Sequence, residues 1–159
     1  NAHFLGERIA RFEEVHLGVA VDTPRGLMVP VLRSACAKSL EEVSAGIKGM
    51  VESCIEGTIL PDQLSGGTFT LTNLGMLGID HFTPVINPPE AAILGVGGIS
   101  LRAVRSRDGE ISYAESITLS LTIDHQAVDG APAARFLKDL VDTLENYPGS
   151  DAGNDKGDE

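Results

Sequence analysis

The segment from Ser100 to Asp124 most constrains the fold, because it contains two strand-like runs joined by Asp108-Gly109. An Asp-Gly pair between two such runs is a strong signal for a β-hairpin with a two-residue loop. In the second run, apolar and polar residues alternate, which is typical of a strand with one buried face. The apolar positions are Ile117, Leu119, Leu121 and Ile123. The sequence therefore predicts an antiparallel pair of strands, the second of which leads directly to His125.

Two other segments have the pattern of amphipathic helices. The run Ser39-Leu40-Glu41-Glu42 has the form of a capping box, in which the serine hydroxyl accepts from the backbone three residues on and Glu42 reaches back. Apolar residues then recur at helical spacing as far as Gly57. The segment 131–145 also carries its apolar residues on one face. We expect a long helix at each of these places.

Four further stretches are rich in strand-forming residues. They are 15–21, 27–33, 66–75 and 91–96. Pro30 interrupts the second stretch and marks it as an edge strand or a bulge. Several strands, one hairpin and two long helices together indicate an α+β fold, in which a layer of helices covers a mixed or antiparallel sheet.

The composition fits one globular domain of ordinary size. Of the 159 residues, 42% are hydrophobic, which is enough for a core, and the formal net charge is −11. So acidic a chain is not expected to bind nucleic acid, because phosphate binding needs clustered Lys and Arg. No apolar run is long enough to span a bilayer, so we expect no membrane partner. Residues 148–159 are rich in Gly, Asp and Asn and are predicted to form a disordered acidic tail.

Cys36 and Cys54 show neither a CxxC spacing nor a histidine at metal-ligand spacing. We interpret them as two reduced, mostly buried thiols and expect no metal site. The chain starts at Asn1, close to a predicted strand, and we expect it to be a fragment of a longer polypeptide.

His125 stands at the end of the predicted buried strand and is followed by Asp129 and Gly130. One interpretation is structural: a hydrogen-bonded histidine, an acid at a helix N-terminus and a glycine turn. The other is chemical. A neutral imidazole with a pKa of about 6.5 can accept a proton, and a thiol with a pKa of about 8.5 needs such a base to become a good nucleophile. The residues alone leave both interpretations open.

Thr72 is placed where the strand in 66–75 enters a glycine-containing turn. A hydroxyl there can donate to a developing oxyanion, and losing one such donor costs other enzymes about 10²–10³ in rate. An ordinary strand threonine is the alternative. Gly130, Asn73 and Asn87 are candidate substrate-binding residues, although Asn87 is equally well explained as a turn residue before Pro88.

Four blocks resemble, in the same order, the catalytic domain of the dihydrolipoamide acyltransferase component of 2-oxo acid dehydrogenase complexes. They are "VAVDTPRGLMVPVLR", "GGTFTLTNLGMLGIDHFTPVINPPEAAILGVGGI", the His-x-x-x-Asp-Gly motif in "DHQAVDGAP", and "ARFLKDLVDTLEN". The resemblance covers residues 1–147, which we expect to be an acyltransferase catalytic domain without its N-terminal part. It implies a two-layer sandwich of helices on a mixed sheet, as in chloramphenicol acetyltransferase.

The resemblance also implies a mechanism. His125 would act as general base on the thiol of coenzyme A, and the resulting thiolate would attack an acyl thioester carried by a lipoyl group. Thr72 would donate a hydrogen bond to the oxyanion. Asp129 would hold the shape of the loop, and Gly130 would let the chain turn tightly behind the histidine. In the family, the histidine and the hydroxyl come from different subunits of a trimer.

The same resemblance sets expectations about substrates and partners. The acyl group is expected to be acetyl or branched-chain, the lipoyl group to be carried on a separate domain, and the dehydrogenase components of the complex to be partners. Gln126 stands where relatives commonly carry arginine, and the arginine that pairs with the motif acid would lie upstream of Asn1. The acidic ending favours a free homotrimer over a larger shell. We expect a bacterial cytoplasmic protein, or a mitochondrial matrix protein if the source is eukaryotic.

Two alternatives stay open on the sequence. One is a stand-alone acetyltransferase of the chloramphenicol type. The other is a non-catalytic core scaffold, which the presence of His125 disfavours. Neither the acyl group nor the activity of the fragment follows from the residues.

Overall fold

The computed structural model describes residues 1–106 and 108–148. Apart from Pro148, the predicted acidic tail therefore lies outside the described residues. The strands are β1 (Ala2–Phe4), β2 (Ile9–Arg11), β3 (Leu17–Val19), β4 (Val21–Thr23), β5 (Gly26–Met28), β6 (Val31–Leu32), β7 (Phe69–Asn73), β8 (Ala92–Arg105) and β9 (Ile111–Ile123). The helices are α1 (Leu40–Glu56) and α2 (Gly130–Glu145), with short 3₁₀ turns η1 (Ala35–Ala37), η2 (Pro61–Leu64) and η3 (Gly75–Leu77).

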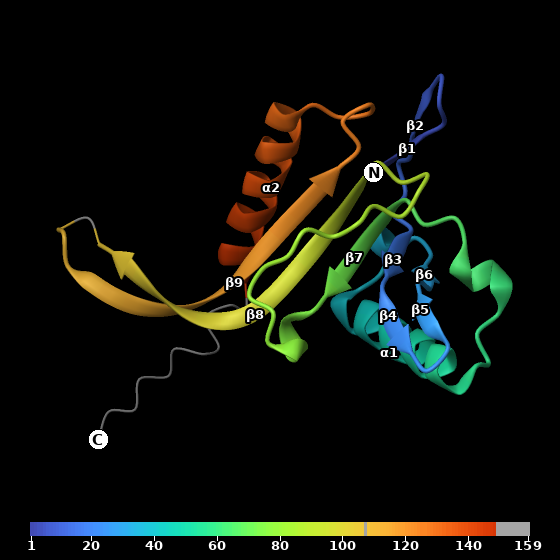
Figure 1. Cartoon of the computed structure of the whole chain (residues 1–159), viewed down its shortest axis with the longest axis horizontal. Helices are drawn as coiled ribbons and strands as arrows, with labels where there is room; N and C mark the ends of the chain where they lie inside the picture. The colour runs from blue at the N-terminus through green and yellow to red at the C-terminus, as the bar shows by residue number, and fades with distance from the viewer. Residues whose placement is uncertain (107, 149–159) are drawn as a thin grey trace.

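The central sheet has five strands in the order β6-β3-β7-β8-β9 (Figure 1). Strand β7 runs parallel to β3 and β8, whereas β6 and β9 pair antiparallel at the two edges. The predicted mixed sheet is confirmed. The stretch containing Pro30 is not the single strand that was predicted: Pro30 lies between β5 and the edge strand β6, which belong to different sheets, because proline cannot donate to a ladder.

Both helices cover the same face of this sheet. Leu17 of β3 pairs with Leu32 on one side and Phe69 on the other, so these three side chains point the same way. A Cβ atom placed on Gly46 of α1 would lie 2.8 Å from Leu32 Cδ1, so α1 packs closely there. The ring of Phe136 in α2 lies 6.0 Å from the ring of Phe69. The predicted two-layer sandwich is therefore confirmed.

The opposite face of the sheet is crossed by the chain from 79 to 90 (Figure 1). Side chains alternate along a strand, so Thr70 and Thr72 point towards this segment. A Cβ atom on Gly95 would lie 2.9 Å from the ring of Phe82, so the glycine lets that ring lie against the strand. This arrangement places Thr72 between the sheet and the crossing segment.

Helix α1 begins and ends as the sequence predicts. The Ser39 hydroxyl accepts from Glu42 N at 3.2 Å, and Ser39 N donates to the Glu42 carboxylate at 2.8 Å. The helix ends at Gly57, whose φ of 82° is the left-handed conformation that favours glycine. The capping box is therefore confirmed.

The hairpin of β8 and β9 projects beyond the body of the molecule (Figure 1). Asp108 and Gly109 lie at its turn, and Gly109 has a φ of 92°. The connection spans 106–110 and is closed by a bond from Ser106 N to Glu110 O at 2.8 Å. The hairpin prediction is confirmed, but the two-residue loop is wrong because the strands stop pairing earlier.

The cysteines differ in their surroundings. Cys54 is buried in α1 and Cys36 is exposed, and both are free thiols. The prediction of mostly buried thiols is right for Cys54 and wrong for Cys36. In the described part of the chain, neither helix has the length and apolarity to cross a membrane. The same residues gather no group of His, Cys, Asp or Glu that could hold a metal ion.

Candidate active site

His125 lies in a turn that Asp124 builds between β9 and α2. Asp124 N donates to Ala91 O at 2.9 Å, which ties the turn to the start of β8. The Asp124 carboxylate accepts from Gln126 N at 2.9 Å, and its carbonyl accepts from Val128 N at 3.0 Å. This is the hydrogen bonding of an Asx turn. A fixed backbone thus presents the His125 side chain, which is 74% exposed.

Asp129 lies next to this imidazole. Its Oδ1 atom is 3.7 Å from His125 Nδ1, beyond hydrogen-bond distance. Asp129 occupies the N-cap position of α2, but its side chain makes no capping hydrogen bond. The carboxylate therefore faces the imidazole and does not act as the cap that the structural interpretation assigned to it.

Gly130 is the first residue of α2. Its φ is not positive, so its backbone conformation is open to other residues, and a Cβ atom placed on it would meet nothing within 4 Å. The expectation that glycine is needed for a tight turn behind the histidine is therefore wrong in this chain. The bonds to Asp124 make that turn instead.

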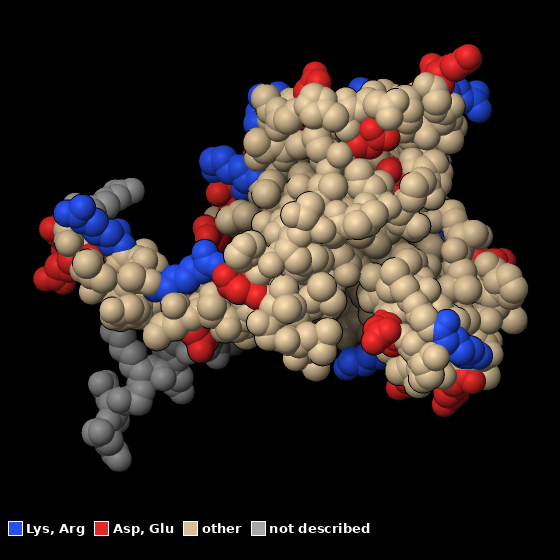
Figure 2. All heavy atoms as spheres, viewed as in Figure 1, with Lys and Arg blue, Asp and Glu red and all other residues tan. Residues whose placement is uncertain are grey.

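Thr72 lines a cavity of about 410 Å³ between the sheet and the segment 79–90. Asn87 lines the same cavity from the opposite wall. Most of the remaining lining is apolar, from residues that include Leu27, Val29, Phe82 and Val85. Figure 2 shows the face on which this cavity lies, and Lys, Arg, Asp and Glu gather mainly at its edges. The cavity therefore offers a hydroxyl and an amide in an apolar setting.

Asn73 is directed elsewhere. Its side-chain oxygen accepts from Gly75 N at 2.8 Å, and it lines a separate hollow beside Gly97 and Ile99. Because side chains alternate along β7, Asn73 points to the face opposite Thr72. The structure thus brings Thr72 and Asn87 to one cavity, and places Asn73 in the turn that follows the strand.

Glu90 is a buried acid behind this cavity that the sequence analysis missed. Only 3% of the residue is exposed. Its carboxylate accepts from the Thr70 hydroxyl at 2.6 Å and from the Asn87 amide at 3.3 Å. Burial raises its pKa, while the two hydrogen bonds and the nearby His3 act in the opposite direction. A glutamate two residues before the apolar strand β8 was the available signal.

Thr72 and His125 of one chain lie at different levels of the sheet. Thr72 pairs with Gly95, and Gly95 pairs with Ser120. From Ser120, β9 continues to Ile123, about 10 Å further along the strand, and two strand spacings add about 10 Å across the sheet. His125 follows Ile123. The hydroxyl and the imidazole of a single chain are therefore too far apart to act on one reacting carbon.

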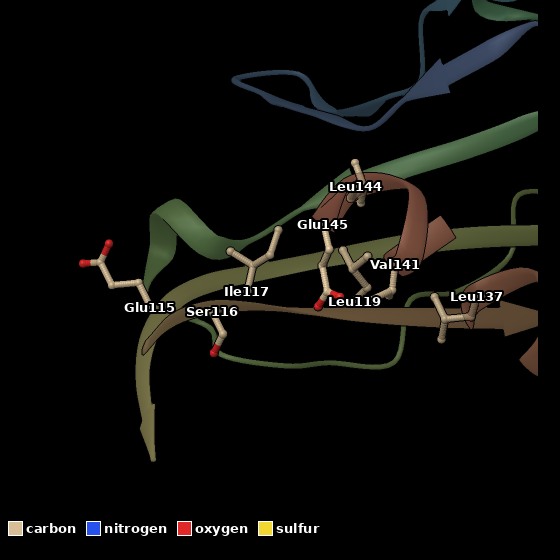
Figure 3. A pocket seen from close by; sticks show the side chains of 8 residues that line it. All are labelled: Glu115, Ser116, Ile117, Leu119, Leu137, Val141, Leu144 and Glu145. Atoms are coloured by element: carbon tan, nitrogen blue, oxygen red, sulfur yellow. The ribbon is translucent and has the colours of Figure 1, made fainter. Parts of the chain in front are cut away.

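A further hollow, of about 350 Å³, lies between α2 and β9. Figure 3 shows Leu137, Val141 and Leu144 of the helix beside Ile117 and Leu119 of the strand. None of the predicted site residues lines this hollow, so it is not part of the candidate active site.

Residues 1–149 match the family model of the 2-oxoacid dehydrogenases acyltransferase, catalytic domain. The chain belongs to this family. The acyltransferase domain is 45% identical over 145 residues to the acetyltransferase component of the acetoin cleaving system of Bacillus subtilis, covering 91% of this chain and 36% of that protein. It is 40% identical over 148 residues to the mitochondrial acetyltransferase component of the pyruvate dehydrogenase complex of Dictyostelium discoideum, covering 92% and 23%.

Solved structures agree with this assignment. The acyltransferase domain superposes on the dihydrolipoamide acetyltransferase of Azotobacter vinelandii with a TM-score of 0.88 and 38% identity, covering 92% of this chain and 60% of that one. A truncated catalytic core from Thermoplasma acidophilum gives a TM-score of 0.78 at 38% identity, covering 91% and 64%. The chain thus spans less than two thirds of these proteins.

Proposed function

We propose that this acyltransferase domain transfers an acyl group between a lipoyl group and coenzyme A. The observation that carries the proposal is an exposed imidazole at position 125, held by a rigid turn in a chain that matches the acyltransferase family over residues 1–149. Similar proteins are named as acetyltransferase components, so acetyl is the expected acyl group. The lipoyl group would be carried on a separate domain.

In the proposed reaction, His125 accepts the proton of the coenzyme A thiol. The lipoyl group supplies the acyl group as a thioester. The sulfur of coenzyme A forms a bond to the acyl carbon, the bond from that carbon to the lipoyl sulfur breaks, and the leaving sulfur takes up the proton from His125. Thr72 donates a hydrogen bond to the acyl oxygen while negative charge develops on it.

The proposed site requires two copies of the chain. Thr72 and His125 of one copy are separated along and across the sheet, as the strand register shows. In a homotrimer, the exposed His125 of one subunit can face the cavity of its neighbour. This arrangement would also enclose the imidazole and exclude water from the reacting thiol.

The residues of this chain fit the proposed substrates. The cavity beside Thr72 is mainly apolar, which suits an acyl group and the hydrocarbon arm of a lipoyl group.

The A. vinelandii acetyltransferase has been studied for the role of a serine, a histidine and an asparagine in its catalytic mechanism, and that asparagine follows the histidine by four positions. Asp129 follows His125 at the same spacing.

Similar proteins are components of dehydrogenase complexes, and one solved relative forms the cubic core of such a complex. We therefore propose dehydrogenase subunits as partners of the protein that contains this domain.

The test is acyl transfer by the natural-length polypeptide that contains this chain. Acetyl-, isobutyryl- and succinyl-dihydrolipoamide would each be offered with coenzyme A, and the acyl-coenzyme A formed would be measured. We expect transfer, fastest with acetyl. Two results would contradict the proposal. One is a protein that transfers acetyl from acetyl-coenzyme A to chloramphenicol but not to dihydrolipoamide. The other is a folded protein that transfers no acyl group.

A further inference from the structure

We infer that Glu90 is a positioning residue for the proposed acyl transfer, because it joins the two walls of the cavity that contains Thr72. The inference rests on the proposed function. We call the three hydrogen-bonded residues Glu90, Thr70 and Asn87 the Glu90 clamp.

The Glu90 clamp connects two segments that are distant in sequence. Thr70 belongs to β7 and donates to one carboxylate oxygen of Glu90 at 2.6 Å. Asn87 belongs to the segment that crosses the sheet and donates to the other oxygen at 3.3 Å. Glu90 N also donates to Asn87 O at 3.0 Å. One carboxylate thus fixes the distance between a strand and the segment opposite it.

Two glycines make room for this arrangement. A Cβ atom on Gly67 would lie 2.6 Å from Glu90 Oε1, and one on Gly18 would lie 2.7 Å from the Thr70 hydroxyl oxygen. Both positions are therefore closed to any larger residue unless the clamp moves. The two glycines thus leave space for a buried hydrogen bond between Glu90 and Thr70, at a place where two apolar side chains would avoid the cost of burying polar groups.

The clamp acts on the proposed site through the strand and the segment it joins. Thr70 and Thr72 lie two positions apart on β7 and line the same cavity, and Asn87 lines the other wall. Loss of the Glu90 carboxylate would let the walls separate and turn the Thr72 hydroxyl away from the acyl oxygen. A displacement of about 1 Å in a reacting geometry can cost about 10²-fold in rate.

Steady-state kinetics of the natural-length protein test this role. We expect Glu90→Ala to lower kcat about 10- to 100-fold with the KM for coenzyme A within about twofold, because the clamp orients a transition-state donor. Glu90→Gln keeps an oxygen that can accept from Thr70 and should retain most of the activity. Thr70→Val should resemble Glu90→Ala, and the double variant should lose little more.

Met50→Ala is the matched control, since Met50 is buried in α1, on the other face of the sheet. It should lower the melting temperature and leave kcat unchanged. A kcat for Glu90→Ala within about twofold of wild type, or a fall no larger than that of Met50→Ala, would overturn the inference.

Amide hydrogen exchange gives a readout that does not depend on activity. Glu90→Ala should raise exchange in 69–73 and in 84–91 together, with α1 unchanged. Unchanged exchange in both segments would overturn the inference. A wild type that transfers no acyl group with any donor would contradict the proposed function, and exchange alone would then decide whether Glu90 joins the two walls.

Discussion

The Nδ1 atom of His125 lies 3.7 Å from Oδ1 of Asp129, and both side chains are largely exposed, by 74% and 83%. A contact of this length between exposed groups is weak. The backbone around His125 is fixed by Asp124, whereas among residues 1–106 and 108–148 only the weak contact with Asp129 orients the imidazole. A second subunit covering the turn would supply the missing constraint.

Asp129 should therefore be replaceable. We expect Asp129→Asn to retain acyl transfer within about tenfold, since the A. vinelandii acetyltransferase has an asparagine at the same spacing. Asp129→Ala should cost less unfolding free energy than the usual value of about 1 kcal/mol for an N-cap, because its side chain makes no capping bond. Urea denaturation measures the free energy of unfolding of each variant. Asp124→Ala, which removes the carboxylate that holds the turn, is the variant for comparison. A loss above about 1 kcal/mol in Asp129→Ala would contradict the expectation.

Thr72→Ala should lower kcat by about 10²-fold with little change in KM, because the hydroxyl acts on charge that develops only in the transition state. Thr72→Ser should keep most of the rate. Thr83→Ala is the control, as Thr83 lines the same cavity and has no proposed role. Equal rates for Thr72→Ala and Thr83→Ala would show that Thr72 is not the donor.

Much of the fold could be predicted because the signals are local. The capping box at Ser39 and Glu42 and the hairpin around Asp108-Gly109 each depend on neighbouring residues, and both are found. The sequence predicted a layer of helices on the sheet but not which strand side chains that layer covers, because this depends on the pairing of Leu17 with Leu32 and Phe69.

The candidate site was predicted only in part for the same reason. The motif predicted His125, and a strand ending in a turn drew attention to Thr72. The Glu90 clamp escaped notice because its partners lie on two different segments that only the folded chain brings together. Residue type alone likewise gave Gly130 a role that the bonds to Asp124 fill.

Ser39→Ala should destabilise the protein by about 1 kcal/mol and leave kcat unchanged, because it removes half of the capping box of a helix distant from the cavity. Chemical denaturation and the acyl-transfer assay measure the two quantities. A lower kcat in a Ser39→Ala variant that is fully folded would mean that α1 contributes to the site.

Glu90 should make stability depend on pH. Burial is the main cause that raises its pKa above the usual 4.5, against the hydrogen bonds from Thr70 and Asn87 and the charges of His3 and the amino group of Asn1. A raised pKa contributes stability that is complete below the usual value and is lost as the pH rises through the raised value. Glu90→Gln lacks this titration.

The free energy of unfolding of wild type should therefore fall relative to Glu90→Gln as the pH rises from about 4.5 towards neutrality. Urea denaturation at several pH values measures the difference in unfolding free energy between the two proteins. A difference that is constant over this range would show that the pKa of Glu90 is the same in the folded and unfolded states.

The most direct test of the proposed mechanism is the rate of acyl transfer from acetyl-dihydrolipoamide to coenzyme A by His125→Ala in the natural-length protein. His81→Ala is the matched control, because His81 is equally exposed and has no proposed role. We predict a loss of about 10²–10⁴-fold for His125→Ala, with an unchanged melting temperature, and no loss for His81→Ala. A His125→Ala variant that transfers acetyl groups at the wild-type rate would contradict the assignment of His125 as the base.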